Sequence, residues 1–492
     1  GVGKFEGIPP HLIGEAFLKH FDILPNTPLA YAHTMVDYVP LAMEYGKLGG
    51  LDHTTTLIKA IRSERGDDKV LLLDGGDTWQ GSYTSLQTQG ADMVEVMRAL
   101  RTEAMVGHWE FTFGQDRLKE LIDKLGYPFL GGNVFDTEWD EPVFESTAFF
   151  EKGGVSIAVI GQHFPYTPIA NPSYMVNGWS FGIRPEVLQK NVNKAKKQGA
   201  EIVVLLSHNG FDVDQKLASM IDGIDVILTG HTHDAIPKGI RIKDTLLLSS
   251  GSHGKYLGRI DLKVKNGKVV DTSSNLIPVF SDIIPPDPDM TKLINKIRAP
   301  YQSECNRVIG ETETLLYRRG NFNGSWDDVI CDTIIRERDT EISLSPGFRW
   351  GTTLLPGQKI TIDDIYSQTS MNYPEVYRIE MTGKMIKEIL EDVCDNIFNP
   401  DPFFQQGGDM VRVGGLTYTC RPKNKMGNRI SNLRIISSDK PLESNKNYVV
   451  GGWGSVNQNV KGPPIYNLLE NYISEKKIIK NNNLEAVKIV GM

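Results

Sequence analysis

The feature that most constrains this chain is a local pattern that recurs through its first half, in which a short apolar run is followed at once by Asp, His or Asn. The pattern occurs at residues 70–77, 202–209 and 226–233, and in a weaker form at 105–108 and 155–163. Helix-like stretches at residues 93–101 and 187–198 lie between these runs, which predicts strands that alternate with helices. In such α/β layers, polar residues beyond the carboxyl ends of the strands converge on one crevice. We therefore predict an α/β domain with one site built from several strand-end loops.

Charge and hydropathy argue against two classes of partner. The 492 residues include 53 Lys and Arg against 61 Asp and Glu, a formal net charge of −8. Most nucleic-acid binders carry an excess of positive charge, which this chain lacks. Apolar runs such as residues 70–73 and 202–206 are far shorter than the roughly 18 to 20 residues that span a membrane. We expect no nucleic-acid partner and no membrane partner.

The four cysteines are far apart in the sequence and form no C-x-x-C pair; they are Cys305, Cys331, Cys394 and Cys420. This spacing excludes a zinc ribbon and a dense disulfide scaffold. We expect four buried thiols that pack as small apolar side chains.

A cluster rich in Pro and Asp at residues 284–289 separates two regions of different character. It precedes a helical stretch from Met290 to about Val308. The remainder of the chain has Gly-rich turns between mixed helix and strand signals, which indicates an α+β domain. We predict a first domain over residues 1–285, a linker helix over 286–309 and a C-terminal domain over 310–492.

The strongest candidates for chemistry share the strand-end positions of the first domain; they are Asp77, His108, His208, His231 and His233. A carboxylate beside several imidazoles suits a divalent ion such as manganese, iron or zinc. Any one of these histidines alone is more often a structural residue. The G-H-x-H arrangement at residues 230–233 favours the ligand role, because two imidazoles directly after a buried strand are costly unless a bound group uses them. We therefore predict a metal site.

Several motifs resemble those of the calcineurin-like metallophosphoesterases, in the same order: Gly75-Gly76-Asp77, Gly107-His108-Trp109-Glu110, Ser207-His208 and Gly230-His231-Thr232-His233. The added C-terminal domain is similar to that of the 5′-nucleotidase family. Within that family, the stretches GHWEFT, PYTPIANP, LSHNGFDVD, SPGFRWG, NPDPFFQQGGDMVRVGGL and YRRGNFNG most resemble the SoxB-type thiosulfohydrolases of the bacterial Sox sulfur-oxidation system. The likeness extends from about Gly49 to Ile430. It implies a four-layer αββα metallophosphoesterase domain followed by an α+β 5′-nucleotidase-type C-terminal domain.

The resemblance also implies roles for the candidate ligands. Asp77 corresponds to the carboxylate that bridges two metal ions, His208 and His231 bind one ion, and His233 binds the other. His108 replaces the Asn of the family's G-N-H-E/D box and is a substitute ligand. Two cations about 3.5 to 4 Å apart need negative charge between them, which a bridging carboxylate supplies. The resemblance implies two Mn²⁺ ions, with zinc or iron as the alternatives, and a periplasmic location.

One family element is missing from the sequence given. The family begins with Asp-x-His at the end of its first strand, and we find no such motif here. Asp52 and His53 are adjacent rather than spaced, and they begin an apparent helix over residues 49–62, where we expect Asp52 to act as a helix cap. In the Sox-type proteins the motif lies just ahead of a segment that resembles residues 1–19. We therefore expect this chain to begin inside the catalytic domain, with its first metal site short of ligands.

A second departure concerns the substrate. Phosphoesterases of the family use the His of the G-N-H-E/D box, oriented by a nearby Asp, to protonate an alkoxide leaving group, and those places are taken here by Trp109 and Thr112. A thiolate, from a thiol of pKa about 8.5, leaves without a proton. The substitution favours a sulfur leaving group, although a packing role is a common alternative for a Trp.

The C-terminal domain supplies the candidate substrate contacts. Arg349, in the motif SPGFRWG, takes the place of the family's oxyanion-binding Arg, and Arg412 appears where nucleotidases have Gln or Asn. Asn323, in YRRGNFNG, completes the substrate-binding set that the resemblance implies. The fixed donors of a guanidinium match the geometry of a sulfonate. We predict that Arg349, Trp109 and Arg412 take part in catalysis.

Three functions follow from the sequence. The first is a dimanganese hydrolase that cleaves the S-sulfonate group from a cysteine of the SoxYZ carrier protein and releases sulfate. The second is a 5′-nucleotidase or related phosphoesterase, which Trp109 and Arg412 disfavour. The third is a non-catalytic carrier-binding protein, which applies only if Asp-x-His is absent from the mature protein.

Overall fold

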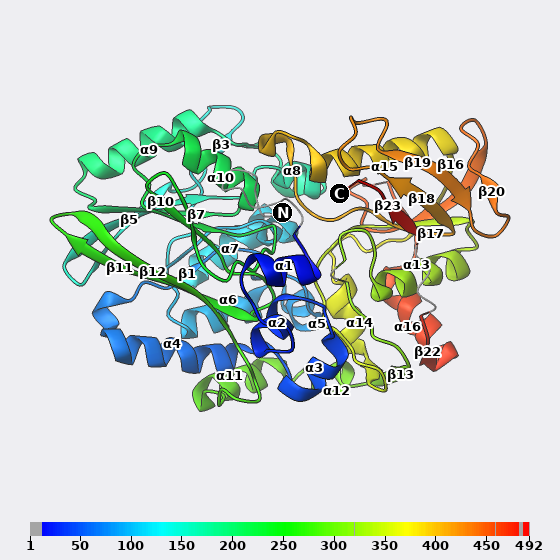
Figure 1. Ribbon diagram of the computed structural model, residues 1–492, viewed down its shortest axis with the longest axis horizontal. Coiled ribbons are helices and arrows are strands. Elements are labelled where there is room, and N and C mark those ends of the chain that lie inside the picture. Colours follow the sequence, from blue (N-terminus) through cyan, green and yellow to red (C-terminus); the bar gives the residue numbers. More distant parts are fainter. Residues whose placement is uncertain (1–11, 319, 458, 482–485, 492) are drawn as a thin grey trace. The chain divides into compact units, whose positions relative to one another are not determined.

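Strands and helices alternate through the first half of the chain, which confirms the pattern predicted from the sequence. The predicted apolar runs form β1 (Leu73–Asp74), β2 (Ala104–Met105), β5 (Val155–Gln162), β7 (Ile202–Ser207) and β8 (Val226–Thr229). The predicted helices between them form α6 (Ala91–Ala99) and α9 (Pro185–Lys197). Figure 1 shows the computed structural model, which describes residues 12–318, 320–457, 459–481 and 486–491.

The chain divides into two units. Unit 1 contains Gly1–Trp79 and Thr88–Arg298, and unit 2 contains Gln80–Gln87 and Ala299–Met492. The segment Gln80–Gln87 therefore leaves unit 1 shortly after β1, joins unit 2 and then returns the chain to unit 1. No pattern in the sequence predicts that this segment belongs to unit 2.

Unit 1 is built on a six-stranded sheet with the order β4-β5-β7-β8-β10-β9. Its remaining strands are β4 (Thr147–Lys152), β9 (Ile240–Ile242) and β10 (Thr245–Ser249). The central strands β5, β7, β8 and β10 are parallel, and the edge strands β4 and β9 are antiparallel to their neighbours. Every residue of β7 is buried, because a central parallel strand is covered on both faces.

A second β layer packs against this sheet. It contains the parallel pair β1-β2 and the long hairpin of β11 (Tyr256–Lys265) and β12 (Lys268–Pro278). Apolar side chains from both layers, among them Val106, Val204 and Ile260, form one core. Helix α9 covers one side of the six-stranded sheet, and α4 (Leu51–Arg65), α6 and α11 (Pro288–Arg298) pack together with residues of the second layer. This order of helix, sheet, sheet and helix is the predicted four-layer arrangement.

Further helices and strands complete unit 1. They are α1 (Gly14–His20), α2 (Pro28–His33), α3 (Tyr38–Tyr45), α7 (Gln115–Leu125), α8 (Thr167–Ala170), α10 (Phe211–Met220), β3 (Val134–Asp136) and β6 (Trp179–Phe181). The predicted helix cap at Asp52 is wrong. The residue before α4 is Gly50, and Asp52 lies in the first turn, where its carboxylate accepts from the Thr291 hydroxyl at 3.0 Å.

Unit 2 combines small sheets with helices, as an α+β fold does. One sheet has the order β16-β21-β14-β17, a second β20-β19-β18-β23 and a third β15-β13-β22. The strands are β13 (Val308–Thr312), β14 (Ile342–Ser345), β15 (Lys359–Thr361), β16 (Tyr377–Thr382), β17 (Arg412–Gly414), β18 (Leu416–Cys420), β19 (Ile430–Ile435), β20 (Lys440–Pro441), β21 (Asn447–Gly452), β22 (Ile478–Ile479) and β23 (Val487–Ile489). The helices are α5 (Tyr83–Thr88), whose last residue lies in unit 1, α12 (Gln302–Cys305), α13 (Ser325–Arg338), α14 (Ile362–Thr369), α15 (Gly383–Phe398) and α16 (Ile465–Lys476).

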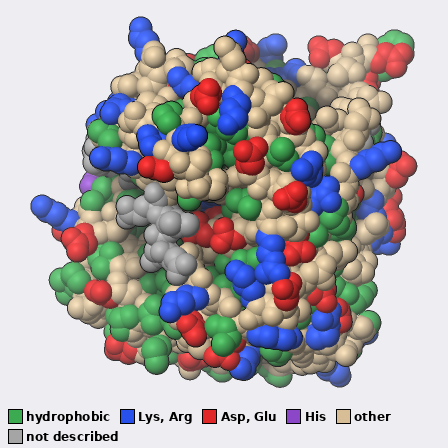
Figure 2. Space-filling model, turned by 90° about the vertical axis from the view of Figure 1, so that its right-hand side faces the viewer, with side chains coloured by type: hydrophobic (Ala, Val, Ile, Leu, Met, Phe, Trp, Pro, Cys, Tyr) green, Lys and Arg blue, Asp and Glu red, His purple; other side chains and the backbone are tan. Residues whose placement is uncertain are grey.

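The segment over residues 286–309 is not one helix. It contains α11 and α12, and the division between the units falls between Arg298 and Ala299. None of the helices in the described part of the chain is long and apolar enough to cross a membrane. Figure 2 shows one face of the molecule, where Lys and Arg side chains are interspersed with Asp and Glu side chains.

Candidate metal centre

Four of the five predicted ligands converge in unit 1. Each of Asp77, His108, His208 and His231 offers one ligand atom, and these atoms all lie within 4.8 Å of one another. Asp77 follows β1, His108 follows β2, His208 follows β7 and His231 follows β8. The convergence therefore arises because parallel strands present their carboxyl ends at one edge of each sheet. The three imidazoles are buried and the carboxylate is partly exposed.

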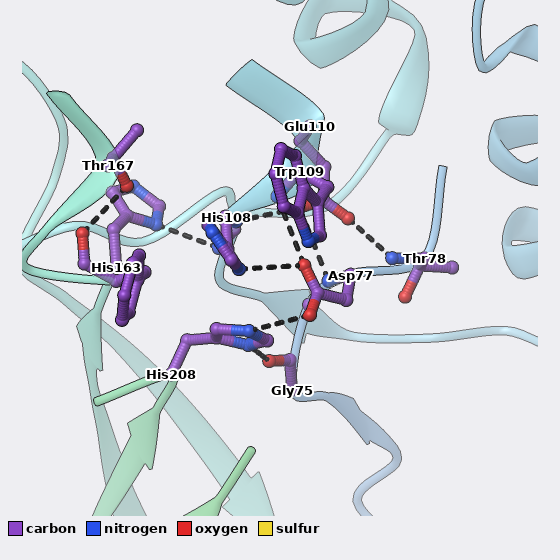
Figure 3. A network of polar contacts seen from close by, with 12 residues as sticks. Gly75, Asp77, Thr78, His108, Trp109, Glu110, His163, Thr167 and His208 are labelled. Carbon is purple, nitrogen blue, oxygen red and sulfur yellow. Dashed lines mark hydrogen bonds and ion pairs between the residues drawn. The ribbon is translucent and has the colours of Figure 1, made fainter. Parts of the chain in front are cut away.

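Asp77 lies at the centre of the cluster (Figure 3). One of its oxygens is 3.1 Å from Nδ1 of His108, and the other is 3.0 Å from Nε2 of His208. The backbone N–H of Trp109 donates to the first oxygen at 3.1 Å. Burial alone would raise the pKa of Asp77, but the two histidines outweigh it and hold the pKa well below its ordinary value. Asp77 is therefore ionised and supplies the negative charge at the centre of the cluster.

The surroundings of His208 fit a metal ligand. Its Nδ1–H donates to the Gly75 carbonyl oxygen at 2.5 Å, which leaves Nε2 facing the Asp77 carboxylate at 3.0 Å. Two electron-pair donors at this distance repel unless a proton or a metal ion lies between them. Burial would lower the pKa of His208, yet the Asp77 charge and the hydrogen bonds to Asp77 and Gly75 raise it. A divalent cation between Nε2 and the carboxylate would hold the two groups together without a shared proton.

The backbone at the site is held in a sparsely populated conformation. Asp77 has φ +61° and His231 has φ +74°, both in the left-handed region that side-chain-bearing residues rarely adopt. At Gly76, with φ +85°, a Cβ would lie 2.8 Å from the Val106 carbonyl oxygen and 3.1 Å from Nδ1 of His208. Only glycine lets the Asp77 loop pass this close to the neighbouring loops. The surrounding structure therefore holds the Asp77 and His231 loops in backbone conformations that are unfavourable by themselves.

Glu110 joins the loops that carry two of the ligands. Its side chain is completely buried, and it accepts from the backbone N–H groups of Asp77 (3.2 Å), Thr78 (2.6 Å), Trp79 (3.4 Å) and His108 (2.8 Å). Burial and the neighbouring Asp77 charge raise the pKa of Glu110 to about 7, against the opposing effect of the N–H donors. The sequence motif includes Glu110, but its spacing gave no reason to assign the residue a role.

His163 ends one of the weaker strand-loop patterns and lies outside the ligand cluster. Its Nδ1 accepts from the backbone N–H of Gly107 at 2.8 Å, and its ring packs among Phe111, Phe129 and Phe144. Burial lowers the pKa of His163 to about 3, so the ring is neutral. His163 therefore supports the loop before His108.

His233 is not part of the four-residue cluster. It lies two residues beyond His231 with φ +59°, and its ring centroid is 5.7 Å from that of His253. The neighbouring His231 ring stacks on Phe164 with a centroid distance of 4.0 Å. The assignment of His233 to a second ion stays a prediction.

The predicted substrate residues lie on three neighbouring segments of unit 2. Arg349 is in the loop that follows β14, and Arg412 pairs with Ser345, the last residue of β14, across the antiparallel β14-β17 pair. The segment that carries Asn323 reaches the same region, because the Asn321 carbonyl oxygen accepts from the backbone N–H of Met410 at 3.0 Å. The three segments are therefore neighbours in the fold although they are far apart in the sequence.

The surroundings of Arg412 differ from those that a substrate contact requires. Its side chain is about 1% exposed and lies 3.2 Å from the carboxylates of both Asp327 and Asp409. Arg318 pairs with the same Asp327 at 2.8 Å, so the four charges form one buried network. The substrate contact predicted for Arg412 stays a prediction, and its burial favours a role in holding the adjacent loop. Arg349 and Asn323 are partly exposed.

The chain is similar enough to known proteins to be assigned to a family. The chain is 36% identical to a solved structure of the sulfate thiohydrolase SoxB from Thermus thermophilus, with a TM-score of 0.95 over 99% of this chain and 91% of that one. The chain belongs to the SoxB family. The family model described as 5′-nucleotidase, C-terminal domain, matches residues 308–455 of this SoxB-family chain.

More distant relatives of this SoxB-family chain are nucleotidases. Human 5′-nucleotidase is 24% identical over 88% of this chain and 84% of its own length. A solved 5′-nucleotidase precursor, also from Thermus thermophilus, is 20% identical, with a TM-score of 0.78 over 90% of this chain and 94% of that one, and shares the fold.

Trp109 and Thr112 lie on the segment that directly follows His108 in this SoxB-family chain. Trp109 begins the 3-10 helix η3 (Trp109–Phe113), and its ring centroid is 4.7 Å from that of His108. Thr112 is about 1% exposed. An indole and a hydroxyl therefore occupy the segment where the resemblance expects an imidazole and a carboxylate.

Proposed function

We propose that this protein is a metal-dependent hydrolase that removes a sulfonate group from a sulfur atom on a carrier-protein cysteine. Water attacks the sulfonate sulfur, the bond to the neighbouring sulfur breaks with its electron pair on the leaving sulfur, and the products are a sulfur anion, sulfate and the two protons of the attacking water. The observation that carries the proposal is the combination of the Asp77, His108, His208 and His231 cluster with Trp109 beside it.

The chemistry of the leaving group explains this combination. An alkoxide is strongly basic and leaves poorly without a general acid, whereas a sulfur anion leaves without one. Trp109 has no ionisable proton to give, and the backbone N–H of Trp109 is instead committed to Asp77. A site of this kind is suited to a sulfur leaving group and poorly suited to a phosphate ester.

The four-residue cluster would hold the metal, for which we propose two Mn²⁺ ions with His233 as a further ligand. A divalent ion bound there supplies Lewis-acid polarisation and activates water for attack at neutral pH. Asp77 contributes negative charge at the centre, and His208 is held in the ligating orientation by Gly75. Glu110 keeps the Asp77 and His108 loops together.

Arg349 is the proposed contact for the sulfonate oxygens. The group carries negative charge throughout the reaction, and a guanidinium offers two parallel donors to it. We expect Arg349→Ala to lower kcat/KM by about 10- to 100-fold, the equivalent of about 1.5 to 3 kcal/mol, and Arg349→Lys to restore it only in part. Unchanged turnover of Arg349→Ala would remove Arg349 from the site.

Sulfate release and phosphate release from the manganese-loaded protein test the reaction directly. The substrates are a carrier protein with a cysteine-bound thiosulfonate and a nucleoside monophosphate. We expect that the rate of sulfate release does not fall at high pH, because no general acid has to protonate the leaving group. We expect negligible phosphate release. The double variant Trp109→His with Thr112→Asp should gain activity on alkyl phosphates and none on the sulfur substrate, because general acid catalysis contributes about 10²- to 10⁴-fold only where the leaving group needs it.

A 5′-nucleotidase is the second candidate, favoured by the 24% identity to human 5′-nucleotidase and by the matching C-terminal domain. Efficient hydrolysis of a nucleoside monophosphate by the unmodified protein would establish this alternative, and Trp109 would then be a packing residue. We extend the leading proposal to SoxYZ as the carrier and to the periplasm as the location, on the basis of membership in the SoxB family.

A further inference from the structure

Two cysteines of unit 2 lie in contact inside its core. The Sγ atoms of Cys394, on α15, and Cys420, the last residue of β18, are 3.7 Å apart. Both side chains are completely buried among apolar residues. A disulfide bond has an S–S length of about 2.05 Å, so the two sulfurs would have to approach by about 1.7 Å. Small side-chain rotations on each residue can supply a movement of this size.

The backbone around the two sulfurs is already held together. Glu391 lies three residues before Cys394 on one face of α15, and Asp395 lies one helical turn after Glu391. The Glu391 carboxylate accepts from the backbone N–H groups of Gly427 (2.8 Å), Arg429 (3.2 Å) and Ile430 (2.8 Å), and Asp395 pairs with Arg429 at 2.5 Å. These contacts fix one turn of α15 against the β18-β19 hairpin that begins with Leu416. A bond between the sulfurs would therefore cost little rearrangement.

We propose that Cys394 and Cys420 form a disulfide bond when the protein folds in an oxidising medium. The two thiols lose two protons and two electrons, one S–S bond forms, and an external disulfide such as oxidised glutathione is reduced to two thiols. Because both sulfurs are buried, this exchange belongs to folding or to local opening rather than to the closed native state. The proposal does not depend on the reaction that the metal centre catalyses.

The bond would enclose the segment that carries two charged residues of the buried network. Residues 395–419 lie between the cysteines and include Asp409 and Arg412. Closing a loop of this length restricts the unfolded chain and stabilises the folded one. Oxidation should therefore stabilise the part of unit 2 that packs against the Arg349 loop, where Asp409 donates its backbone N–H to the Gly347 carbonyl oxygen at 3.2 Å.

Refolding of the full chain in a glutathione redox buffer tests the proposal. After denaturation and alkylation with N-ethylmaleimide, the oxidised wild type should take up two alkyl groups, and the reduced wild type should take up four. A non-reducing peptide map should join the peptides that contain Cys394 and Cys420. Reduction should lower the melting temperature of unit 2 by roughly 5 to 10 °C.

Two double variants provide the controls. Cys305→Ser with Cys331→Ser keeps the proposed pair, and it should show the same linked peptides and the same effect of reductant. Cys394→Ser with Cys420→Ser should take up two alkyl groups with or without oxidant and should not respond to reductant. Uptake of four alkyl groups by the oxidised wild type, or a link between any other pair, would overturn the proposal.

Discussion

At the scale of single residues, Glu110 connects two segments of the metal centre that are more than 30 residues apart. Its two oxygens accept from the backbone of the Asp77 loop and from the N–H of His108. Neither contact involves a ligand atom, so the role of Glu110 is to position the ligands. Residues that orient metal ligands typically contribute 10- to 100-fold to metal affinity.

We expect Glu110→Gln to weaken Mn²⁺ binding by about 10- to 100-fold, measured by isothermal titration calorimetry. The amide replaces one acceptor oxygen with an NH₂ group, which leaves buried N–H groups of the two loops without an acceptor. Glu120→Gln is the matched control, because Glu120 is exposed and pairs with Arg117 and Lys124 on α7. Equal metal affinity in wild type and Glu110→Gln would contradict the positioning role.

His163 makes the stability of unit 1 depend on pH. The folded-state pKa of about 3 lies below the ordinary value of 6.5, so the unfolded chain binds a proton at higher pH than the folded chain does. Above pH 6.5 both states are neutral and His163 has no effect. As the pH falls from 6.5 towards 3, the free energy of unfolding decreases by up to about 1.4 kcal/mol for each pH unit.

We expect His163→Gln to remove this part of the pH dependence. The Gln side chain offers an acceptor for the Gly107 N–H but takes up no proton in this range. Urea unfolding between pH 7.5 and 4 should show a steeper loss of stability for wild type than for the variant below pH 6.5. Parallel curves across the range would contradict the assignment.

The sequence predicted that Asp77, His208 and His231 come together, but it did not predict which residues support them, and the reason is physical. Asp77, His208 and His231 follow apolar runs whose strands are parallel, so a local pattern predicts where they meet. The role of Glu110 depends on which distant N–H groups surround it, and that depends on the tertiary fold. The sequence signal for this role was the position of Glu110, a carboxylate between Trp109 and Phe111 in an apolar stretch.

At the scale of elements, the loop that carries Arg349 is anchored from inside unit 2. Arg318 donates to the carbonyl oxygen of Pro346, the first residue of this loop, at 3.0 Å and to the Gln368 carbonyl oxygen at 2.7 Å. The indole N–H of Trp350 donates to the same Gln368 oxygen at 2.8 Å. Both ends of the Arg349 segment are thus tied to α14 or to the charge network.

We expect Arg318→Met to destabilise unit 2 by about 3 to 5 kcal/mol, because it leaves the buried Asp327 with one cation instead of two. Arg434→Met is the matched control, since Arg434 makes an Nε contact of similar length, 2.9 Å, with the exposed Asp439. That exposed pair should contribute no more than about 1 kcal/mol. Urea unfolding of both variants would measure the difference, and equal losses would contradict the prediction.

Elements with a strong periodic pattern were predicted closely, and others were not. The run at residues 202–206 became β7, and the helix predicted over 187–198 became α9, because a buried strand and an amphipathic helix each leave a clear local signal. The boundary of α4 is set instead by Gly50 and by packing against the segment of Thr291. The sequence around Asp52 does not predict that packing.

At the scale of the whole molecule, the chain crosses between the two units three times. It leaves unit 1 after Trp79, two residues beyond Asp77, returns at Thr88 and leaves again after Arg298. The ligand cluster belongs to unit 1, and the proposed Cys394–Cys420 bond belongs to unit 2. Metal and reductant therefore act on different units, and their effects on stability can be separated.

We expect Mn²⁺ to raise the melting temperature of unit 1 and to leave that of unit 2 nearly unchanged in differential scanning calorimetry. At a free concentration 100 times Kd, binding to the folded state contributes about 2.7 kcal/mol, and a chelator should reverse it. His208→Ala should lose the metal-dependent shift because it removes a ligand, while the effect of reductant on unit 2 should persist. If Mn²⁺ raised both melting temperatures equally, this prediction would be wrong and the two units would unfold as one cooperative body. The short connections on either side of Gln80–Gln87 would then explain the coupling between the units.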